Sequence, residues 1–151
     1  MKAVLLPLLS ASMLLIGCVE DITADDSSAF QYLQRGDTAL ADDKRIQIIS
    51  SQSSYDDIYY RVLNLNATPQ TIDFNQYQVL LVMAGSAQKA LELNVVGFTG
   101  LDNQVQIRLQ TSYNASGCNA NSANSQPWLL VLFPKVDKPL VISELAEIRA
   151  C

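Results

Sequence analysis

Apolar residues occur in short runs along the chain, and the pattern of apolar and polar positions in each run predicts the element that it forms. Residues 45–50 (RIQIIS) predict a first strand. Residues 77–84 (YQVLLVMA) and 128–133 (WLLVLF) are nearly continuous apolar runs, which are typical of strands covered on both faces. We therefore expect both segments to be buried strands, the first of them central in its sheet.

Three other segments also have strand character. Residues 91–98 (LELNVVGF) and 105–112 (VQIRLQTS) alternate in part between apolar and polar positions, as half-buried antiparallel strands do. Residues 100–103 (GLDN) supply the turn between them. Residues 140–148 are expected to form a final strand that pairs near residues 128–133.

Residues 50–65 (SSQSSYDDIYYRVLNL) have helical spacing instead. Ser53 or Ser54 is expected to cap this helix, and Asp56 and Asp57 are expected in its first turn, where the helix dipole favours negative charge. This interpretation is favoured over a catalytic or metal-binding pair of acids. The helix should end at residues 66–69 (NATP). The apolar residues that recur at i, i+3, i+4, i+7 and i+8 are Tyr55, Ile58, Tyr59, Val62 and Leu63.

Together these elements predict one domain over residues 44–151. We expect an α+β fold that is mainly antiparallel β, with five or six strands in a sandwich-like arrangement and one early α-helix. Before it, residues 19–43 carry seven acidic residues and one basic residue among scattered apolar ones. This composition predicts an acidic tether over residues 18–43, with a short helical turn at residues 30–33.

The first eighteen residues (MKAVLLPLLSASMLLIGC) have the order of an export signal. A positive Lys2 precedes an uncharged apolar stretch that is shorter than the about 20 residues of a membrane-spanning helix. Leu15-Ile16-Gly17-Cys18 closely resembles the lipobox of bacterial lipoproteins. This resemblance implies a signal peptide over residues 1–17, cleavage after Gly17 and attachment of lipid to Cys18.

The lipid predicted on Cys18 would anchor the protein to a membrane. One acyl chain binds reversibly, but each buried methylene adds about 0.8 kcal/mol, so two or three chains hold firmly. By resemblance to lipoprotein sorting in Gram-negative bacteria, Val19 is not the aspartate associated with retention in the inner membrane. We therefore expect the periplasmic face of the outer membrane, with the inner membrane as the alternative.

Composition excludes several classes of function. The formal net charge is −5, and no run of four basic residues occurs, so the chain lacks the clustered Lys and Arg that nucleic-acid binding needs. Histidine is absent, which removes His-based acid–base catalysis and the commonest zinc ligand. No GxSxG elbow accompanies the scattered serines. We expect no enzyme activity, no metal site and no cofactor.

Three cysteines, Cys18, Cys118 and Cys151, form no CxxC pair or other metal-ligand spacing. With Cys18 lipidated in an oxidising compartment, we expect Cys118 and Cys151 to form a disulfide. Such a bridge contributes about 3 to 4 kcal/mol on the chain-entropy model. The alternative, a nucleophilic Cys118, lacks a histidine to activate it.

The longest segment without strand character is residues 114–126 (NASGCNANSANSQ). Loops of this length inside a domain are often functional, and the Asn and Ser side chains offer uncharged donors and acceptors for a peptide or polar ligand. The alternative is a solvated connection, with Trp128 simply beginning a buried strand. The candidate partner-binding residues are Asn114, Asn119, Asn121 and Trp128.

Four short motifs occur in order along the chain: IDFN at 72–75, YQVLLVMAG at 77–85, SQPW at 125–128 and FPK at 133–135. Together with the order of the elements, they resemble the carboxy-terminal domain of the protease-complex subunit PrcB family, over residues 44–142. That family occurs on bacterial lipoproteins and secreted proteins, and its name derives from a membrane-bound protease complex. The chain departs from it after Gly85, where SAQKAL replaces a Pro-Thr-Gly-Gly-Tyr-like loop.

The PrcB resemblance implies the fold and a non-catalytic role, but no function for the altered loop. With the lipobox, it predicts a lipid-anchored periplasmic binding or accessory module that assists or restrains an envelope protein such as a protease. The alternative is a structural envelope lipoprotein without a dedicated ligand.

Overall fold

The computed structural model describes residues 30–118 and 125–151. Within them the chain forms seven strands in two sheets and one short α-helix, so the α+β, mainly β expectation is confirmed. The helix α1 (Gln52–Asp57) continues as a π-helical turn, η1 (Ile58–Val62), and a 3-10 turn, η2 (Ser86–Gln88), follows later. The strands are β1 (Gln31–Gly36), β2 (Arg45–Ile49), β3 (Tyr77–Met83), β4 (Glu92–Gly100), β5 (Val105–Asn114), β6 (Trp128–Pro134) and β7 (Leu140–Arg149).

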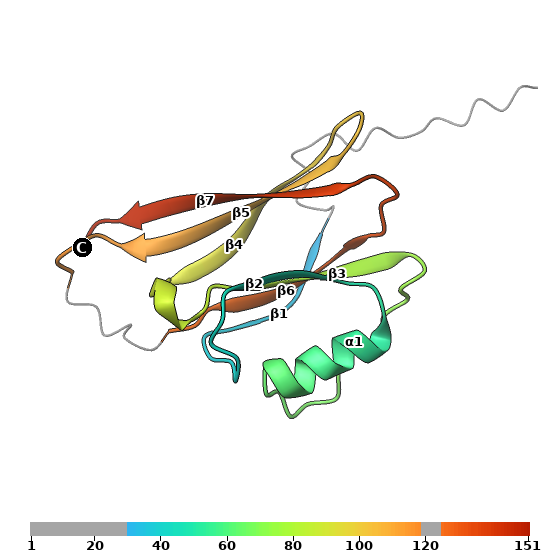
Figure 1. The fold of residues 1–151 in the computed structure, drawn as a ribbon, viewed down its shortest axis with the longest axis horizontal. Coiled ribbons are helices and arrows are strands. Elements are labelled where there is room, and N and C mark those ends of the chain that lie inside the picture. Colours follow the sequence, from blue (N-terminus) through green and yellow to red (C-terminus); the bar gives the residue numbers. More distant parts are fainter. Residues whose placement is uncertain (1–29, 119–124) are drawn as a thin grey trace, which may run out of the picture.

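The two sheets lie face to face, and α1 covers the outer face of the larger one (Figure 1). The four-stranded sheet has the order β1-β6-β3-β2, with every neighbour antiparallel. The three-stranded sheet has the order β4-β5-β7, in which β4 and β5 are antiparallel and β5 and β7 are parallel. The molecule is therefore a sandwich with a third, helical layer.

Strands β3 and β6 are buried on both faces, which explains their continuous apolar runs. Alternate residues of β3 point to opposite sides: Leu80 and Val82 enter the core between the sheets, while Val79, Leu81 and Met83 face the helix. The core between the sheets also contains Leu93, Val95, Phe98, Val105, Ile107, Leu109, Leu129, Val131 and Phe133. The core beneath the helix also contains Ile49, Tyr55, Ile58, Tyr59, Leu63, Ile72, Trp128 and Leu130.

The helix begins earlier than the sequence indicated. Ser51 is the N-cap, in an extended conformation, and its hydroxyl accepts from the backbone N–H of Ser54 at 3.3 Å. Capping by Ser53 or Ser54 is therefore wrong. Because the start moves upstream, Asp56 and Asp57 lie outside the first turn. None of the helices in the described part of the chain is long and apolar enough to cross a membrane.

Residues 31–36, which we expected in the tether, form the edge strand β1 against β6. The predicted helical turn at residues 30–33 is wrong, because Phe30 and Tyr32 pack against the core between the sheets and Leu33 against the core beneath the helix. The domain thus includes residue 30 onward rather than starting at residue 44, and β1 raises the strand number above five or six. The signal peptide, Cys18 and the tether up to residue 29 lie outside the described residues.

The final strand has a different partner from the one predicted. β7 pairs with β5 in parallel, without interruption from Val105↔Leu140 to Asn114↔Arg149, rather than near β6. This is possible because the chain leaves β5, crosses to the other sheet as β6 and returns as β7. The turn predicted at residues 100–103 is confirmed, and the Leu101 N–H donates to the Gln104 carbonyl at 2.8 Å.

Candidate functional site

The predicted disulfide between Cys118 and Cys151 is present, with the two Cα atoms 5.6 Å apart. Cys118 follows β5 and Cys151 follows β7. Because these strands are parallel and in register, their carboxyl ends emerge side by side, and the Ala115 N–H donates to the Arg149 carbonyl at 2.9 Å. The disulfide therefore closes one end of the three-stranded sheet and holds the start of the Asn/Ser-rich loop against the carboxyl terminus.

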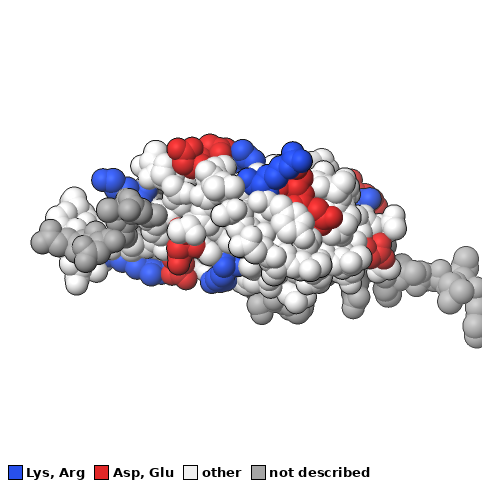
Figure 2. Space-filling model, turned by 90° about the horizontal axis from the view of Figure 1, so that it is seen from below, with Lys and Arg blue, Asp and Glu red and all other residues white. Residues whose placement is uncertain are grey.

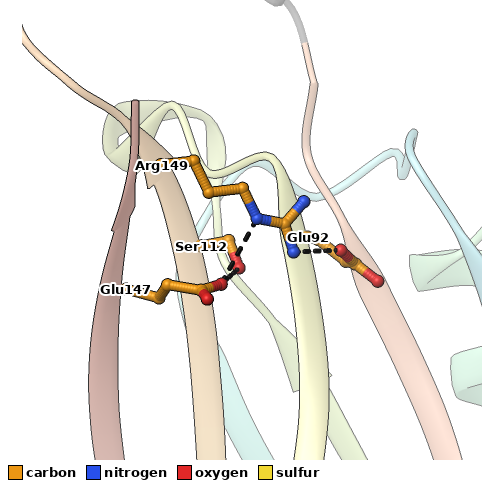
Figure 3. A network of polar contacts seen from close by, with 4 residues as sticks. All are labelled: Glu92, Ser112, Glu147 and Arg149. Carbon is orange, nitrogen blue, oxygen red and sulfur yellow. Dashed lines mark hydrogen bonds and ion pairs between the residues drawn. The ribbon is translucent and has the colours of Figure 1, made fainter. Parts of the chain in front are cut away.

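A network of charged and polar side chains lies beside this disulfide, across all three strands of the smaller sheet (Figure 3). Arg149 Nη2 lies 2.7 Å from Glu92 Oε2, and its Nε lies 3.3 Å from Glu147 Oε2. The hydroxyl of Ser112 donates to the same Glu147 oxygen at 2.6 Å. Arg149 thus links β7 to β4 over the intervening strand β5.

Strand register explains why these residues meet. Glu92 is paired with Ser112, and Ser112 with Glu147, so the three form one row across the sheet. Their neighbour Leu93 points into the core between the sheets, so this row lies on the opposite, outer face. Ser112 is nevertheless completely buried. Sequence alone indicates that Glu147 and Arg149 share a face, but bringing in Glu92 requires the order of the strands.

The network keeps its carboxyl groups charged. The hydrogen bond from Arg149 holds the pKa of Glu92 below its ordinary value, and the hydrogen bond from Ser112 does the same for the pKa of Glu147. Its bond to Glu92 raises the pKa of Arg149. A carboxyl that serves as a general acid near neutral pH needs a raised pKa, so this arrangement suits a structural clamp.

The candidate loop is described only at its two ends. Asn114 is the last residue of β5, where it is half-buried and paired with Arg149. At the other end, the Gln126 N–H donates to the Asp37 carbonyl at 2.8 Å. Asn119 and Asn121 lie outside the described residues.

Trp128 does not lie where a partner can reach it. Only 3% of the residue is exposed, its ring packs in the core beneath the helix, and its Nε1 donates to the Thr38 carbonyl at 2.7 Å. A Cβ at Gly36 would come within 2.6 Å of the indole ring, so this strand needs glycine there. The proposal of Trp128 as a contact residue is corrected: it begins a buried strand and is covered by residues assigned to the tether.

The clefts formed by the described residues are largely open to solvent. One of about 330 Å³ lies between β2 and the helix, and its charged groups already have partners, since Arg45 binds Asp43 and Asp57 binds Arg61. Residues 30–118 and 125–151 contain no group of three or more acidic or cysteine side chains that could hold a metal ion. Seen from the side of α1, charges of both signs are interspersed with uncharged surface (Figure 2).

The segment after Gly85, where the chain departs from the PrcB-like pattern, is packed against residues 42–44, which lead into β2. Gly85 has a φ of +76°, and a Cβ there would meet the Lys44 backbone nitrogen at 2.6 Å. The Ser86 N–H donates to the Asp42 carbonyl at 2.9 Å. Here β3 therefore ends in a tight turn held against residues 42–44.

Comparison of the chain with protein-family models, with curated proteins and with solved structures gave no match. We therefore infer function from the residues of the sequence and from the geometry of the described chain. That geometry brings three features together at one end of the smaller sheet: the disulfide, the Arg149 network and the start of the polar loop.

Proposed function

We propose that this protein is a lipid-anchored binding or accessory module of the bacterial envelope that faces the periplasm. The observation that carries the proposal is the Cys118–Cys151 disulfide, which uses two of the three cysteines and leaves Cys18, in the lipobox-like LIGC, as the one to receive lipid. Disulfides of this kind persist in oxidising compartments such as the periplasm. Lipid on Cys18 would hold the domain at the outer membrane.

The binding region in this proposal is the disulfide-bonded end of the smaller sheet. The polar loop of residues 114–126 begins beside Cys118 and ends at Gln126, which is hydrogen-bonded to Asp37. Loops whose ends are held by a rigid scaffold are common recognition elements. The PrcB resemblance, which rests on the quoted motifs, supports an envelope protein, such as a protease, as the partner.

A structural envelope lipoprotein without a dedicated ligand is the second candidate. It is favoured by clefts that are largely open to solvent and by the mixture of charges on the face around α1 (Figure 2). Ligand sites are usually concave and contain a few convergent polar groups. In this alternative, the domain packs against several envelope components.

Metabolic labelling with an alkynyl fatty acid tests the anchor. We expect the full chain to incorporate the label and Cys18→Ala to lose it. The double variant Cys118→Ala/Cys151→Ala is the matched control, because it removes two thiols but keeps Cys18. Label retained in Cys18→Ala would refute the lipid assignment.

Crosslinking in intact envelopes, followed by purification of the full chain, tests the binding role. One protein recovered in stoichiometric amount supports a dedicated partner, whereas a diffuse set supports the structural alternative. Asn119→Ala/Asn121→Ala should reduce recovery of that partner severalfold. Asn103→Ala, in the turn between β4 and β5, is the control, because this exposed asparagine lies at the opposite end of the sheet. Equal losses in the two variants would exclude recognition by the loop.

A further inference from the structure

The two sheets have four edge strands, and three of them have features that hinder the addition of another strand. β1 has a register shift between Tyr32 and Gln34, and β2 has only 5 residues. β4 has a register shift between Val95 and Gly97, and the Val95 N–H donates to the hydroxyl of Tyr32 at 2.8 Å. The fourth edge, β7, has 10 residues and pairs with β5 without a register shift.

The hydrogen bonds at its two ends show which backbone groups of β7 face its open side. The carbonyls of Pro139 and Arg149 accept from Val105 and Ala115, both at 2.9 Å, so they point toward β5. Backbone groups alternate in direction along a strand, so the odd-numbered residues between them also bond to β5. The N–H and C=O groups that point outward are those of Ile142, Glu144, Ala146 and Ile148.

The same strand exposes apolar side chains. Within the described residues, three of the eight exposed large hydrophobics lie on β7: Val141 at 38%, Leu145 at 49% and Ile148 at 64%. The Glu144 carboxylate, beside the outward-pointing groups, forms an ion pair with Lys44 at 2.5 Å. The disulfide draws Cys151 toward Cys118 at the end of β5, and thus away from the open side.

We propose that β7 pairs in antiparallel fashion with β7 of a second copy of this chain, about a two-fold axis at Leu145. The two three-stranded sheets would then form one continuous sheet of six strands. In this register the outward-pointing groups bond to each other, because Ile142 lies opposite Ile148 and Glu144 opposite Ala146.

Side chains decide between this register and its neighbours. With the axis at Leu145, two exposed leucines meet, Ser143 faces Glu147, and no like charges are directly opposed. An axis at Glu144 would place that carboxylate opposite its own copy, which is destabilising. An axis at Ala146 would place Leu145 opposite Glu147. A second copy therefore fits this edge best with the axis at Leu145.

Disulfide trapping tests this register. Leu145 faces its copy in a non-hydrogen-bonded pair, where Cα atoms lie about 4.5 Å apart and a disulfide can close. Leu145→Cys in the purified full chain, oxidised with copper phenanthroline, should give a product of twice the mass that reductant reverses. Leu101→Cys is the matched control, because Leu101 is 40% exposed but lies in the β4–β5 turn. Equal trapping of both variants, or no trapping of Leu145→Cys, would overturn the proposal.

A charge on the axis provides a second, independent test. Leu145→Glu would oppose two carboxylates and should raise the dissociation constant of the dimer at least tenfold in analytical ultracentrifugation. Leu101→Glu, with the same change of charge, should leave it unchanged. A native chain that stays monomeric in this measurement, or a Leu145→Cys product crosslinked in the envelope to a protein of different mass, would contradict pairing with a second copy.

Discussion

Arg149 Nη2 lies 2.7 Å from Glu92 Oε2, and this contact joins the two outer strands of the three-stranded sheet across β5. The same guanidinium contacts Glu147, whose carboxylate accepts from the buried Ser112. The network lies next to the disulfide that joins the ends of β5 and β7. The ion pairs of Arg149 and the Cys118–Cys151 disulfide therefore both hold this end of the sheet together.

Arg149→Ala should destabilise the protein slightly. It removes two ion pairs and leaves Glu92 and Glu147 without their shared cation, but all three groups are partly exposed. We expect the melting temperature to fall by less than about 5 °C in differential scanning calorimetry. Arg61→Ala is the control, because its side chain is 82% exposed and pairs with Asp57 one turn along the helix. An equal fall in both variants would show that the network adds nothing.

The network also predicts how stability depends on pH. The native pKa values of Glu92 and Glu147 lie below the ordinary values of the unfolded chain. Their contribution is therefore full above the unfolded pKa and is lost as pH falls through the native pKa, because the unfolded state binds protons first. Urea unfolding between about pH 5 and pH 3 should show this loss.

Arg149→Ala serves as the comparison for the pH series, because it removes the hydrogen bonds from Arg149 that help to lower both pKa values. The free energy of unfolding of this variant should fall less steeply with acid than that of the native chain. Parallel curves for the two proteins would contradict the assignment of these pKa shifts to Arg149.

Loss of the disulfide should be the largest single effect. Cys118→Ala/Cys151→Ala should lower the free energy of unfolding by about 3 to 4 kcal/mol, because the reduced chain regains the loop-closure entropy of the residues between the two cysteines. Urea unfolding of this variant and of the reduced native chain should agree. Mass spectrometry of the unreduced protein after alkylation should find neither cysteine modified, and two alkylated thiols would refute the bridge.

Trp128→Phe tests the buried indole. It removes the donor to the Thr38 carbonyl and part of a buried ring, and it should lower the free energy of unfolding by about 1 to 3 kcal/mol, because a hydrogen bond and core packing are lost together. Partner binding should not change once folding is verified, because the side chain is buried. A variant of native stability that loses its partner would restore Trp128 as a contact residue.

Gly36→Ala tests the packing above that ring. The added Cβ would lie 2.6 Å from Trp128 Cζ2, so the ring or the strand must shift. We expect a loss of about 1 to 3 kcal/mol in urea unfolding. In Gly36→Ala/Trp128→Phe the loss caused by the alanine should shrink, since the smaller ring makes room for it. Strictly additive losses would show that the contact is not the cause.

Local sequence pattern was sufficient for the elements that carry their own signal. The apolar runs of β3 and β6 predict buried strands because residues covered on both faces need no polar positions. Helical spacing likewise predicts the face formed by Tyr55, Ile58 and Tyr59. The strand β1 was missed because Tyr32 and Leu33 are isolated apolar residues among polar ones, and they become buried only when β6 lies beside them.

Of the candidate site, one feature could be predicted from the sequence, and the others required the tertiary structure. The pairing of Cys118 with Cys151 follows from assigning Cys18 to lipid, without any structure. The burial of Trp128 depends on Thr38, which lies 90 positions earlier in the chain, and on Gly36, two residues before Thr38. The Glu92–Arg149 contact requires β4 and β7 to flank the same strand.

The sequence by itself determined six of the seven strands, the helix face, the disulfide partners and the lipobox-like motif, because each depends on neighbours along the chain or on a count of cysteines. Only the tertiary structure decided that β7 lies parallel to β5. That choice requires the chain to cross to the other sheet and return, which no local pattern encodes. It brings Cys118 beside Cys151 and Arg149 within reach of Glu92, and it leaves the outer side of β7 open.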